Sequence, residues 1–276
     1  MFNWKMVFLI VFLVTGGCAG IDNSDTRNQS FDVIEPVQAQ EVDQDKEPPL
    51  QREKPEEVNN GQLAKLYPET VFLSGPTTEK KIALTFDDGP DPRVTGSLLD
   101  LLKQESVPAT FFLMGARVEA FPQLAKRMSD EGHSIGSHTY WHRPLIELTN
   151  DEAEVELQKT NTAIKQAIGK ETTLFRPPFG SMNEEKVELM RDLGYSVIIW
   201  SVDSEDWKAS PPDEIAKEVV DAVRPGSIIL HHDGANWNTD LSGTVTAVEQ
   251  EIKELKEMGY TFVTVPELLN LSGQPQ

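Results

Sequence analysis

Short apolar segments alternate with longer amphipathic segments through most of this chain, from about residue 77 to its end. The apolar segments are rich in β-branched and aromatic residues, as strands are, and the segments between them have helical periodicity. Regular alternation of strand and helix is typical of parallel βαβ units. We therefore expect an α/β fold, closed into a barrel or, as we favour, a distorted and incomplete (β/α) barrel of about seven strands. The predicted strands are KIALTF, ATFFLM, SIGSH, TLFRP, SVIIW, SIILHH and TFVTV.

The N-terminus has the layout of an exported protein. Lys5 precedes an apolar run over residues 6–14, and small residues follow before Cys18, which is a signal-peptide pattern. The run is shorter than the roughly 20 apolar residues that a membrane-spanning helix needs. Cys18 is the only cysteine, and the segment around it resembles a bacterial lipobox, which predicts lipidation at Cys18. We expect residues 1–18 to be a lipoprotein-type signal peptide; the alternative is an ordinary signal with an incidental cysteine.

Residues 19–76 separate the predicted signal from the alternating pattern. Between residues 19 and 60 there are eleven acidic and four basic residues and little apolar periodicity. Such a composition buries too little apolar surface to offset the entropy of ordering the chain. We predict a disordered acidic tether over residues 19–76, with a poorly packed extension of the next domain as the alternative. The protein would be exported and anchored by lipid to the outer face of the bacterial cell membrane, or secreted.

The charge of the chain argues against one class of partner. Its formal net charge is −20 at pH 7, whereas binding of nucleic acid needs clustered lysine and arginine. We therefore expect no nucleic-acid partner, and we expect a monomer. The five histidines all lie between residues 133 and 232, which points to a site built from that part of the chain.

Polar side chains stand where the predicted strands end, and in α/β barrels the loops at the carboxyl ends of the strands carry the chemistry. The candidates are Asp87 and Asp88 after KIALTF, His138 and His142 at and after the end of SIGSH, Arg176 after TLF, Asp203 after SVIIW and His232 after SIIL. Two adjacent carboxylates are costly to bring together unless a cation or donor compensates them. For Asp87 and Asp88 the alternative is ordinary turn chemistry before Gly89.

Asp88, His138 and His142 together have the composition of a metal site. The two histidines are four residues apart, so on one helical turn both imidazoles would reach a single ion. Taken alone, a histidine pair at this spacing more often packs in a core or lies on a surface. With one carboxylate the pair forms a set that suits Zn²⁺, our first choice, and also Co²⁺, Mn²⁺, Ni²⁺ or Fe²⁺.

The remaining candidates suit the attack of an activated water on an acyl carbon. A carboxylate must take a proton from the water, and a protonated group must give one to the leaving nitrogen. Asp87 is the candidate base and His232 the candidate acid, with Arg176 and Asp203 as their charge partners. His231 would point to the opposite side of the strand from His232.

Over residues 79–270 the chain resembles the polysaccharide deacetylase family, which is also called the NodB homology family or carbohydrate esterase family 4. TFDDGP, HTYWH, RPPFG, DSEDW and LHH are similar to the five family motifs, in the same order. The resemblance implies that residues 77–276 form the deacetylase domain. It implies Asp87 as the general base and Asp88, His138 and His142 as the metal ligands.

The resemblance implies further roles for residues near the predicted site. Arg176 would pair with Asp87, the backbone N–H of Phe179 would help to hold the oxyanion, Asp203 would keep His232 protonated, Trp207 would line the sugar groove, and Leu230 would contact the acetyl methyl group. The family usually has tyrosine where this chain has Phe179. A main-chain donor should tolerate that difference, whereas any contact through the hydroxyl is lost.

The implied function is removal of the N-acetyl group from N-acetylglucosamine in an extracellular polysaccharide. We expect peptidoglycan, with chitin-like polymers and poly-N-acetylglucosamine as alternatives. An acetylxylan-type O-deacetylase would use the same machinery. A non-catalytic carbohydrate-binding lipoprotein of the cell surface could share the fold, but it has no physical need for the complete set of residues. An Fe²⁺ oxygenase has no separate support in the sequence.

Overall fold

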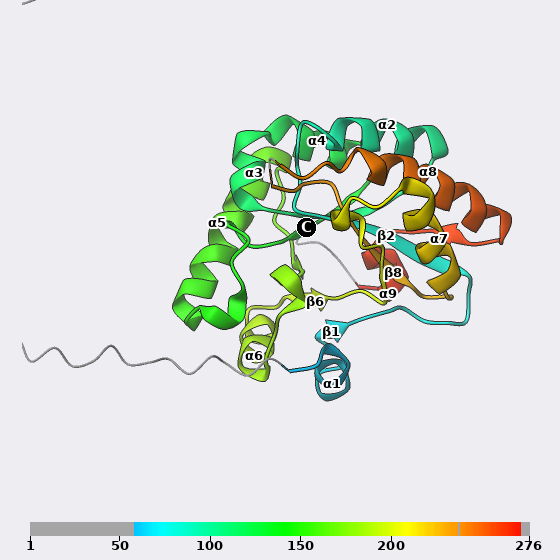
Figure 1. Cartoon of the computed structure of the whole chain (residues 1–276). Helices are drawn as coiled ribbons and strands as arrows, with labels where there is room; N and C mark the ends of the chain where they lie inside the picture. The colour runs from blue at the N-terminus through cyan, green and yellow to red at the C-terminus, as the bar shows by residue number, and fades with distance from the viewer. Residues whose placement is uncertain (1–57, 237, 272–276) are drawn as a thin grey trace, which may run out of the picture. The chain divides into compact units, whose positions relative to one another are not determined.

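The computed structural model describes residues 58–236 and 238–271 (Figure 1). The predicted signal peptide, Cys18 and residues 19–57 of the predicted tether lie outside these residues. The strands are β1 Val71–Phe72, β2 Lys81–Asp87, β3 Thr110–Leu113, β4 Ser134–Ser137, β5 Leu174–Phe175, β6 Ser196–Ile198, β7 Val202–Asp203, β8 Ile228–His232 and β9 Thr261–Phe262. The α-helices are α1 Asn60–Leu66, α2 Thr95–Glu105, α3 Gly115–Ala120, α4 Pro122–Asp130, α5 Asn150–Ile168, α6 Glu184–Asp192, α7 Pro212–Ala222, α8 Ser242–Glu257 and α9 Val265–Leu269. Three short 3₁₀ helices are η1 Leu145–Glu147, η2 Pro178–Gly180 and η3 Asp206–Lys208.

The strands form one curled parallel sheet in the order β1-β6-β5-β4-β3-β2-β8-β7, and β9 pairs separately with β2. Among the described residues β1 and β7, at the two ends of this order, are not paired with each other, so the barrel is open. The prediction of an incomplete (β/α) barrel is confirmed. All seven predicted strands are present, and β1 and β7 are added at the ends.

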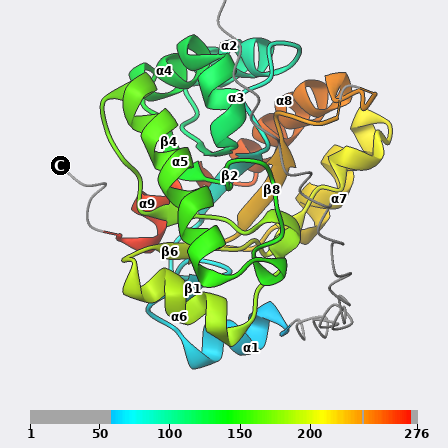
Figure 2. The ribbon, with the colours of Figure 1, turned by 90° about the vertical axis from the view of Figure 1, so that its left-hand side faces the viewer.

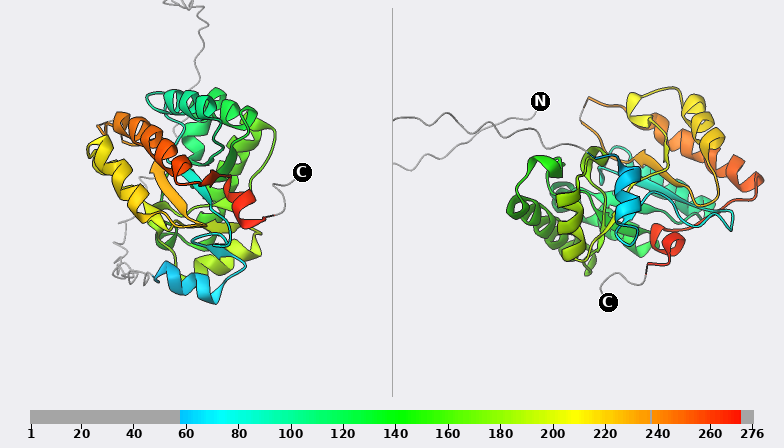
Figure 3. Two further views of the ribbon diagram at one scale, coloured as in Figure 1. Left: turned by 90° about the vertical axis from the view of Figure 1, so that its right-hand side faces the viewer. Right: turned by 90° about the horizontal axis from the view of Figure 1, so that it is seen from below.

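Successive side chains of β2, the longest of the described strands, point alternately to an outer and an inner part of the core. Leu84 and Phe86 pack with apolar residues of the surrounding helices, among them Leu98 of α2 and Ile252 of α8. These helices form an outer layer around the strands (Figures 2 and 3). Ala83 belongs instead to a separate inner cluster. Because successive side chains of a strand point to opposite faces, Thr85 and Asp87 share the inner face with Ala83.

The inner cluster fills one end of the open barrel. Val265 and Leu268 of α9 pack there against Ala83 and Phe112. Strand β9, which precedes α9, pairs with Lys81 and Ile82 at the amino end of β2. The amino ends of the strands are therefore covered by apolar side chains, and the carboxyl ends remain for polar groups.

The fold begins before residue 77, so the predicted tether is wrong over its last part. Strand β1 pairs with β6 through Val71 and Val197. Leu63 of α1 is fully buried in a cluster that also contains Val197 and Met190. The sequence pattern missed this segment because α1 is one short helix and β1 has only two residues, which is too short for a period to be recognised.

Within residues 58–236 and 238–271, none of the helices has the length and apolar character that crossing a membrane requires.

Candidate metal centre and active site

The polar residues singled out from the sequence meet at the carboxyl ends of the strands. Asp87 is the last residue of β2 and lies in register with His232, the last residue of β8. His138 directly follows β4, and Arg176 directly follows β5. Because the strands are parallel, their carboxyl ends lie at one edge of the sheet, and residues up to 145 positions apart in the sequence become neighbours.

Asp88, His138 and His142 form a group whose ligand atoms all lie within 4.8 Å of one another. Oδ1 of Asp88 lies 3.2 Å from Nε2 of His142 and 3.4 Å from Nε2 of His138. The two imidazole rings are 5.0 Å apart between centroids. The structure thus brings the three predicted metal ligands together.

The expectation that the two histidines share a helical turn is wrong. Residues 138–142 form a loop between β4 and η1. Thr139 and His142 both have left-handed backbone conformations, with φ values of 61° and 58°. These two positions turn the chain back on itself, so the imidazoles converge by loop geometry and not by helical periodicity.

Two observations show that this group fits a divalent metal ion. His138 places its Nδ1 2.8 Å from the carbonyl oxygen of Arg176. If Nδ1–H donates to that carbonyl, the lone pair of Nε2 faces Asp88, which is the arrangement that metal-binding histidines commonly have. Oδ1 of Asp88 is buried and, among the described residues, has no hydrogen-bond partner, and a buried polar atom of this kind calls for a ligand.

The electrostatics of the group favour the ligating form of Asp88. Burial alone would raise the pKa of this carboxyl, but the contact and charge of His138 and the charge of His142 hold its pKa well below the usual value. Asp88 is therefore ionised at neutral pH. Burial lowers the pKa of His142, and the neutral imidazole is the form that binds a metal.

Asp87 is held from the inner side of the barrel by Arg176. The two residues form a buried ion pair in which Nη1 of Arg176 lies 2.8 Å from Oδ1 of Asp87. Arg176 also donates to the hydroxyl oxygen of Thr85 and to the carbonyls of Ile198 and Ile199. The guanidinium is thereby fixed by two side chains of β2 and by two carbonyls at and just after the end of β6, and it fixes Asp87 beside the metal group.

Asp206, and not the predicted Asp203, holds His232. Oδ1 of Asp206 lies 2.7 Å from Nδ1 of His232, and Oδ2 accepts the backbone N–H of His232 at 2.9 Å. The side chain of Asp203 is exposed and accepts the backbone N–H of Glu205. Burial alone would lower the pKa of His232, but the hydrogen bond and charge of Asp206 raise it to about 9. His232 is therefore protonated at neutral pH.

Sequence reasoning missed Asp206 because DSEDW contains two aspartates and gives no local sign of which one is buried. The chain turns at Glu205, whose φ of 52° is left-handed, and enters η3 with Asp206 facing inward. Contacts from further along the chain, with His232 at 26 positions and with Thr244 at 38 positions, distinguish the two acids.

His231 points away from the metal group, as the strand alternation predicted. It is fully buried, and its Nε2 lies 3.0 Å from Oε2 of Glu251 on α8. Its ring also stacks on Phe86, with 5.6 Å between centroids. His231 therefore packs in the outer part of the core, between β8 and α8.

The residues predicted to contact substrate occupy different environments. Phe179 and Trp207 are exposed, with 67% and 51% of their surface accessible, and Leu230 is buried. The Phe179 ring meets His142 edge to face, with 4.6 Å between centroids. Phe179 is thus free to contact a ligand at the metal group, and Trp207, which follows Asp206 in η3, is also accessible, whereas Leu230 offers little surface.

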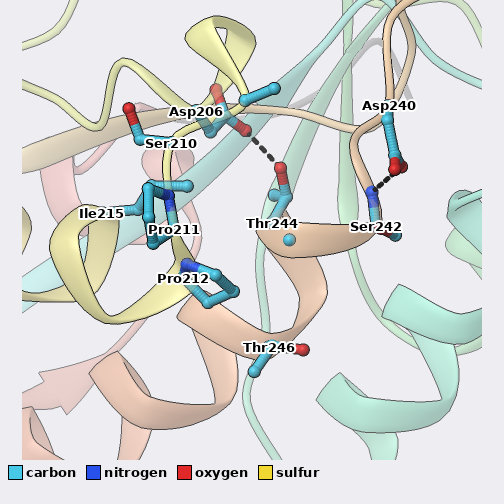
Figure 4. Close-up of a pocket in the computed structure, with 11 residues that line it drawn as sticks. Asp206, Ser210, Pro211, Pro212, Ile215, Asp240, Ser242, Thr244 and Thr246 are labelled. Carbon is cyan, nitrogen blue, oxygen red and sulfur yellow. Dashed lines mark hydrogen bonds between the residues drawn. The ribbon is translucent and has the colours of Figure 1, made fainter.

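A cavity of about 380 Å³ adjoins Asp206 near the amino-terminal ends of α7 and α8 (Figure 4). Ser210, Pro212 and Thr244 are among its lining residues. Thr244 donates to Oδ2 of Asp206 at 2.8 Å, so one wall of the cavity is tied to the carboxylate that holds His232. The metal group does not line this cavity.

Comparison with known proteins agrees with this geometry. The family model for polysaccharide deacetylase matches residues 74–198. A peptidoglycan-N-acetylglucosamine deacetylase of Bacillus cereus is 40% identical over 202 residues, which cover 73% of this chain and 73% of that protein. The chain belongs to the polysaccharide deacetylase family. The resemblance noted in its motifs is confirmed, and the matched residues include Asp87, Asp88, both predicted histidine ligands and Arg176.

Solved structures of other members of the polysaccharide deacetylase family have the same fold. The Bc1960 peptidoglycan N-acetylglucosamine deacetylase superposes with a TM-score of 0.71 at 38% identity, covering 74% of this chain and 94% of that one. BA3943 from Bacillus anthracis, described as a pseudoenzyme of carbohydrate esterase family 4, superposes with a TM-score of 0.66 at 34% identity, covering 71% and 68%. The family therefore includes at least one protein that is described as lacking enzymatic activity.

Proposed function

We propose that this polysaccharide deacetylase family member is a metal-dependent hydrolase that removes N-acetyl groups from N-acetylglucosamine in an extracellular polysaccharide, with peptidoglycan as its substrate. The observation that carries the proposal is the arrangement of two charged pairs beside one metal-binding group. One pair, Asp87 with Arg176, lies at the carboxyl end of β2. The other pair, His232 with Asp206, lies at the carboxyl end of the neighbouring strand β8, and both are close to Asp88. The names of two related B. cereus proteins, both peptidoglycan-N-acetylglucosamine deacetylases, support the choice of polymer.

The side chains divide the chemistry between them. Asp88, His138 and His142 would hold the ion, Zn²⁺ by our choice. When bound, such an ion polarises an acyl oxygen and lowers the pKa of a water. Asp87, whose orientation Arg176 fixes, takes the proton of the attacking water. His232, which Asp206 keeps protonated, gives its proton to the leaving nitrogen. The backbone N–H of Phe179 would stabilise the oxyanion, and Trp207 would support the sugar ring. Leu230 would contact the acetyl methyl only through the 3% of its surface that is accessible.

Acetate release tests the proposal. The purified protein is incubated with isolated peptidoglycan, with N-acetylglucosamine oligomers and with acetylated xylan, each with added Zn²⁺ and with a chelator. We expect zinc-dependent release of acetate from peptidoglycan and at least a hundredfold lower rate for Asp87→Asn. Release from xylan alone would favour the O-deacetylase alternative. Binding to these glycans without any acetate above background would support a non-catalytic protein, as BA3943 is described, and would overturn the proposal.

We also propose that the protein is an exported lipoprotein anchored at Cys18 and facing the cell wall. The lipobox-like segment before Cys18 and the acidic residues after it support this location. Expression of the full chain in a Gram-positive host with a clickable fatty acid tests it. Labelling of the wild type, loss of label in Cys18→Ala and release of that variant into the medium are expected. Absence of label from the wild type would overturn the lipid anchor.

A further inference from the structure

The loop between His138 and His142 is held by a buried carboxylate of a neighbouring helix. Oε2 of Glu156, on α5, accepts the backbone N–H groups of Tyr140 at 2.8 Å and of Trp141 at 2.9 Å. Only 5% of the surface of Glu156 is accessible, and glutamate is rarely buried without a specific partner. Within the described part of the chain this carboxylate has no ion-pair partner within 4.0 Å. Its charge is therefore directed at the backbone of the loop.

The other side of the same loop is held by the start of α3. Gly115 donates its backbone N–H to the carbonyl of Thr139 at 3.0 Å, and Ala116 donates to that of Tyr140 at 3.2 Å. A side chain at Gly115 would meet the ring of Tyr140 at 2.5 Å, so α3 and the loop are in close contact. The peptide groups between the two histidines are thus held between α3 and Glu156.

This loop needs external support because it has no regular structure and is strained. Thr139 and His142 both have positive φ values, and each non-glycine residue in that region costs about 1 to 2 kcal/mol. Hydrogen bonds to an ionised acceptor are roughly twice as strong as those between neutral groups. Two such bonds from adjacent residues are enough to offset the strain and to keep both imidazoles directed at Asp88.

We propose that Glu156 is a positioning residue for the metal site, which fixes the loop that carries His138 and His142 in its ligating conformation and thereby sets the affinity for the metal. The inference rests on the metal site of the proposed function. Glu156 does not itself reach the ion: it acts through the backbone of Tyr140 and Trp141. Removal of such supporting contacts from metal sites typically costs about 10- to 100-fold in affinity.

The test measures zinc binding directly and so does not depend on activity. Competition with a chromophoric chelator gives the dissociation constant for wild type, Glu156→Ala and Glu156→Gln, and Co²⁺ absorption spectra report the ligand geometry. We expect Glu156→Ala to bind Zn²⁺ about 10- to 100-fold more weakly. Glu156→Gln keeps an oxygen acceptor without its charge, and we expect a loss of about 3- to 10-fold.

Glu154→Ala is the matched control, because it removes an identical side chain two residues earlier on α5 that is only partly buried. We expect it to bind Zn²⁺ as the wild type does. Saturating Zn²⁺ should restore much of the turnover of Glu156→Ala, as a defect of affinity predicts. Glu156→Ala with a lower unfolding temperature but zinc affinity within twofold of wild type would overturn the inference. If that variant does not fold, unchanged affinity in Glu156→Gln would overturn it. A wild type that binds no metal would overturn the proposed function as well, so the two failures can be distinguished.

Discussion

Asp206 contacts His232 twice, through Oδ1 to Nδ1 of the ring at 2.7 Å and through Oδ2 to the backbone N–H at 2.9 Å. The carboxylate therefore fixes the orientation of the imidazole as well as its charge. This relationship gives the clearest prediction for the pH dependence of the reaction.

Asp206→Asn should lower kcat by at least about tenfold and move the alkaline limb of the pH–rate profile to lower pH. His232 must hold a proton to donate it, so activity falls as pH rises through its pKa. Asp206 raises that pKa to about 9, and loss of the carboxylate lowers it. A cation on Asp88 adds positive charge near His232, so the wild-type limb should lie at or below about pH 9. Turnover measured from pH 5 to pH 10 checks this.

Asp203→Asn is the control for that experiment. The side chain of Asp203 is exposed and has no hydrogen bond to His232. The alkaline limb of the pH–rate profile of Asp203→Asn should coincide with that of the wild type. A limb that shifts in Asp203→Asn and stays in place in Asp206→Asn would show that the aspartates have the opposite roles.

Zinc should stabilise the folded protein through Asp88. A ligand that binds only the native state adds about 2.7 kcal/mol of stability at a concentration 100 times its dissociation constant. Thermal unfolding with Zn²⁺ and with chelator should therefore show a higher unfolding temperature in zinc for the wild type and for Asp203→Asn. Asp88→Asn should show little difference, because it removes the charged ligand. An equal zinc effect in Asp88→Asn would place the ion elsewhere.

Arg176→Met should destabilise the protein by about 3 to 5 kcal/mol, because it leaves Asp87 as a buried charge without its partner. Arg176 and Asp87 are both almost fully buried. Guanidinium denaturation measures the free energy of unfolding. Arg191→Met, which removes an exposed arginine that pairs with the neighbouring Asp192, should change the free energy of unfolding by less than about 0.5 kcal/mol.

The same pair should be coupled in a double-mutant cycle. Asp87→Asn combined with Arg176→Met should cost less than the sum of the two single changes, because the second change no longer breaks an ion pair. Strict additivity of the two costs would mean that the 2.8 Å contact between the side chains contributes nothing to stability.

Trp207→Ala should raise KM about 2- to 10-fold, with a smaller effect on kcat. The indole is half exposed, and an aromatic contact is worth about 0.5 to 1.5 kcal/mol. Initial rates over a range of oligomer concentrations separate the two constants. Met258→Ala, which removes another exposed apolar side chain at the end of α8, should leave both unchanged. A loss confined to kcat in Trp207→Ala would instead mean that the indole acts on the reacting groups.

The sequence by itself determined the barrel and the place of the site. Strand and helix periods are local properties of the chain, so the pattern from KIALTF to TFVTV predicted seven of the eight strands that the structure describes over this stretch, and it missed only β7, which has two residues. The polar residues at strand ends had to meet, because parallel strands end at one edge. This is why the sequence alone groups Asp88, His138 and His142.

Only the tertiary structure decided the details that depend on contacts between distant residues. It chose Asp206 over Asp203 as the partner of His232, through a turn that buries one acid and exposes the other. It formed the histidine loop from hydrogen bonds to Glu156 and α3, where spacing alone indicated a helical turn. It added β1 by pairing with β6, 126 positions along the chain. Side-chain partners across such separations are set by packing of the whole domain, and no local pattern of residues records them.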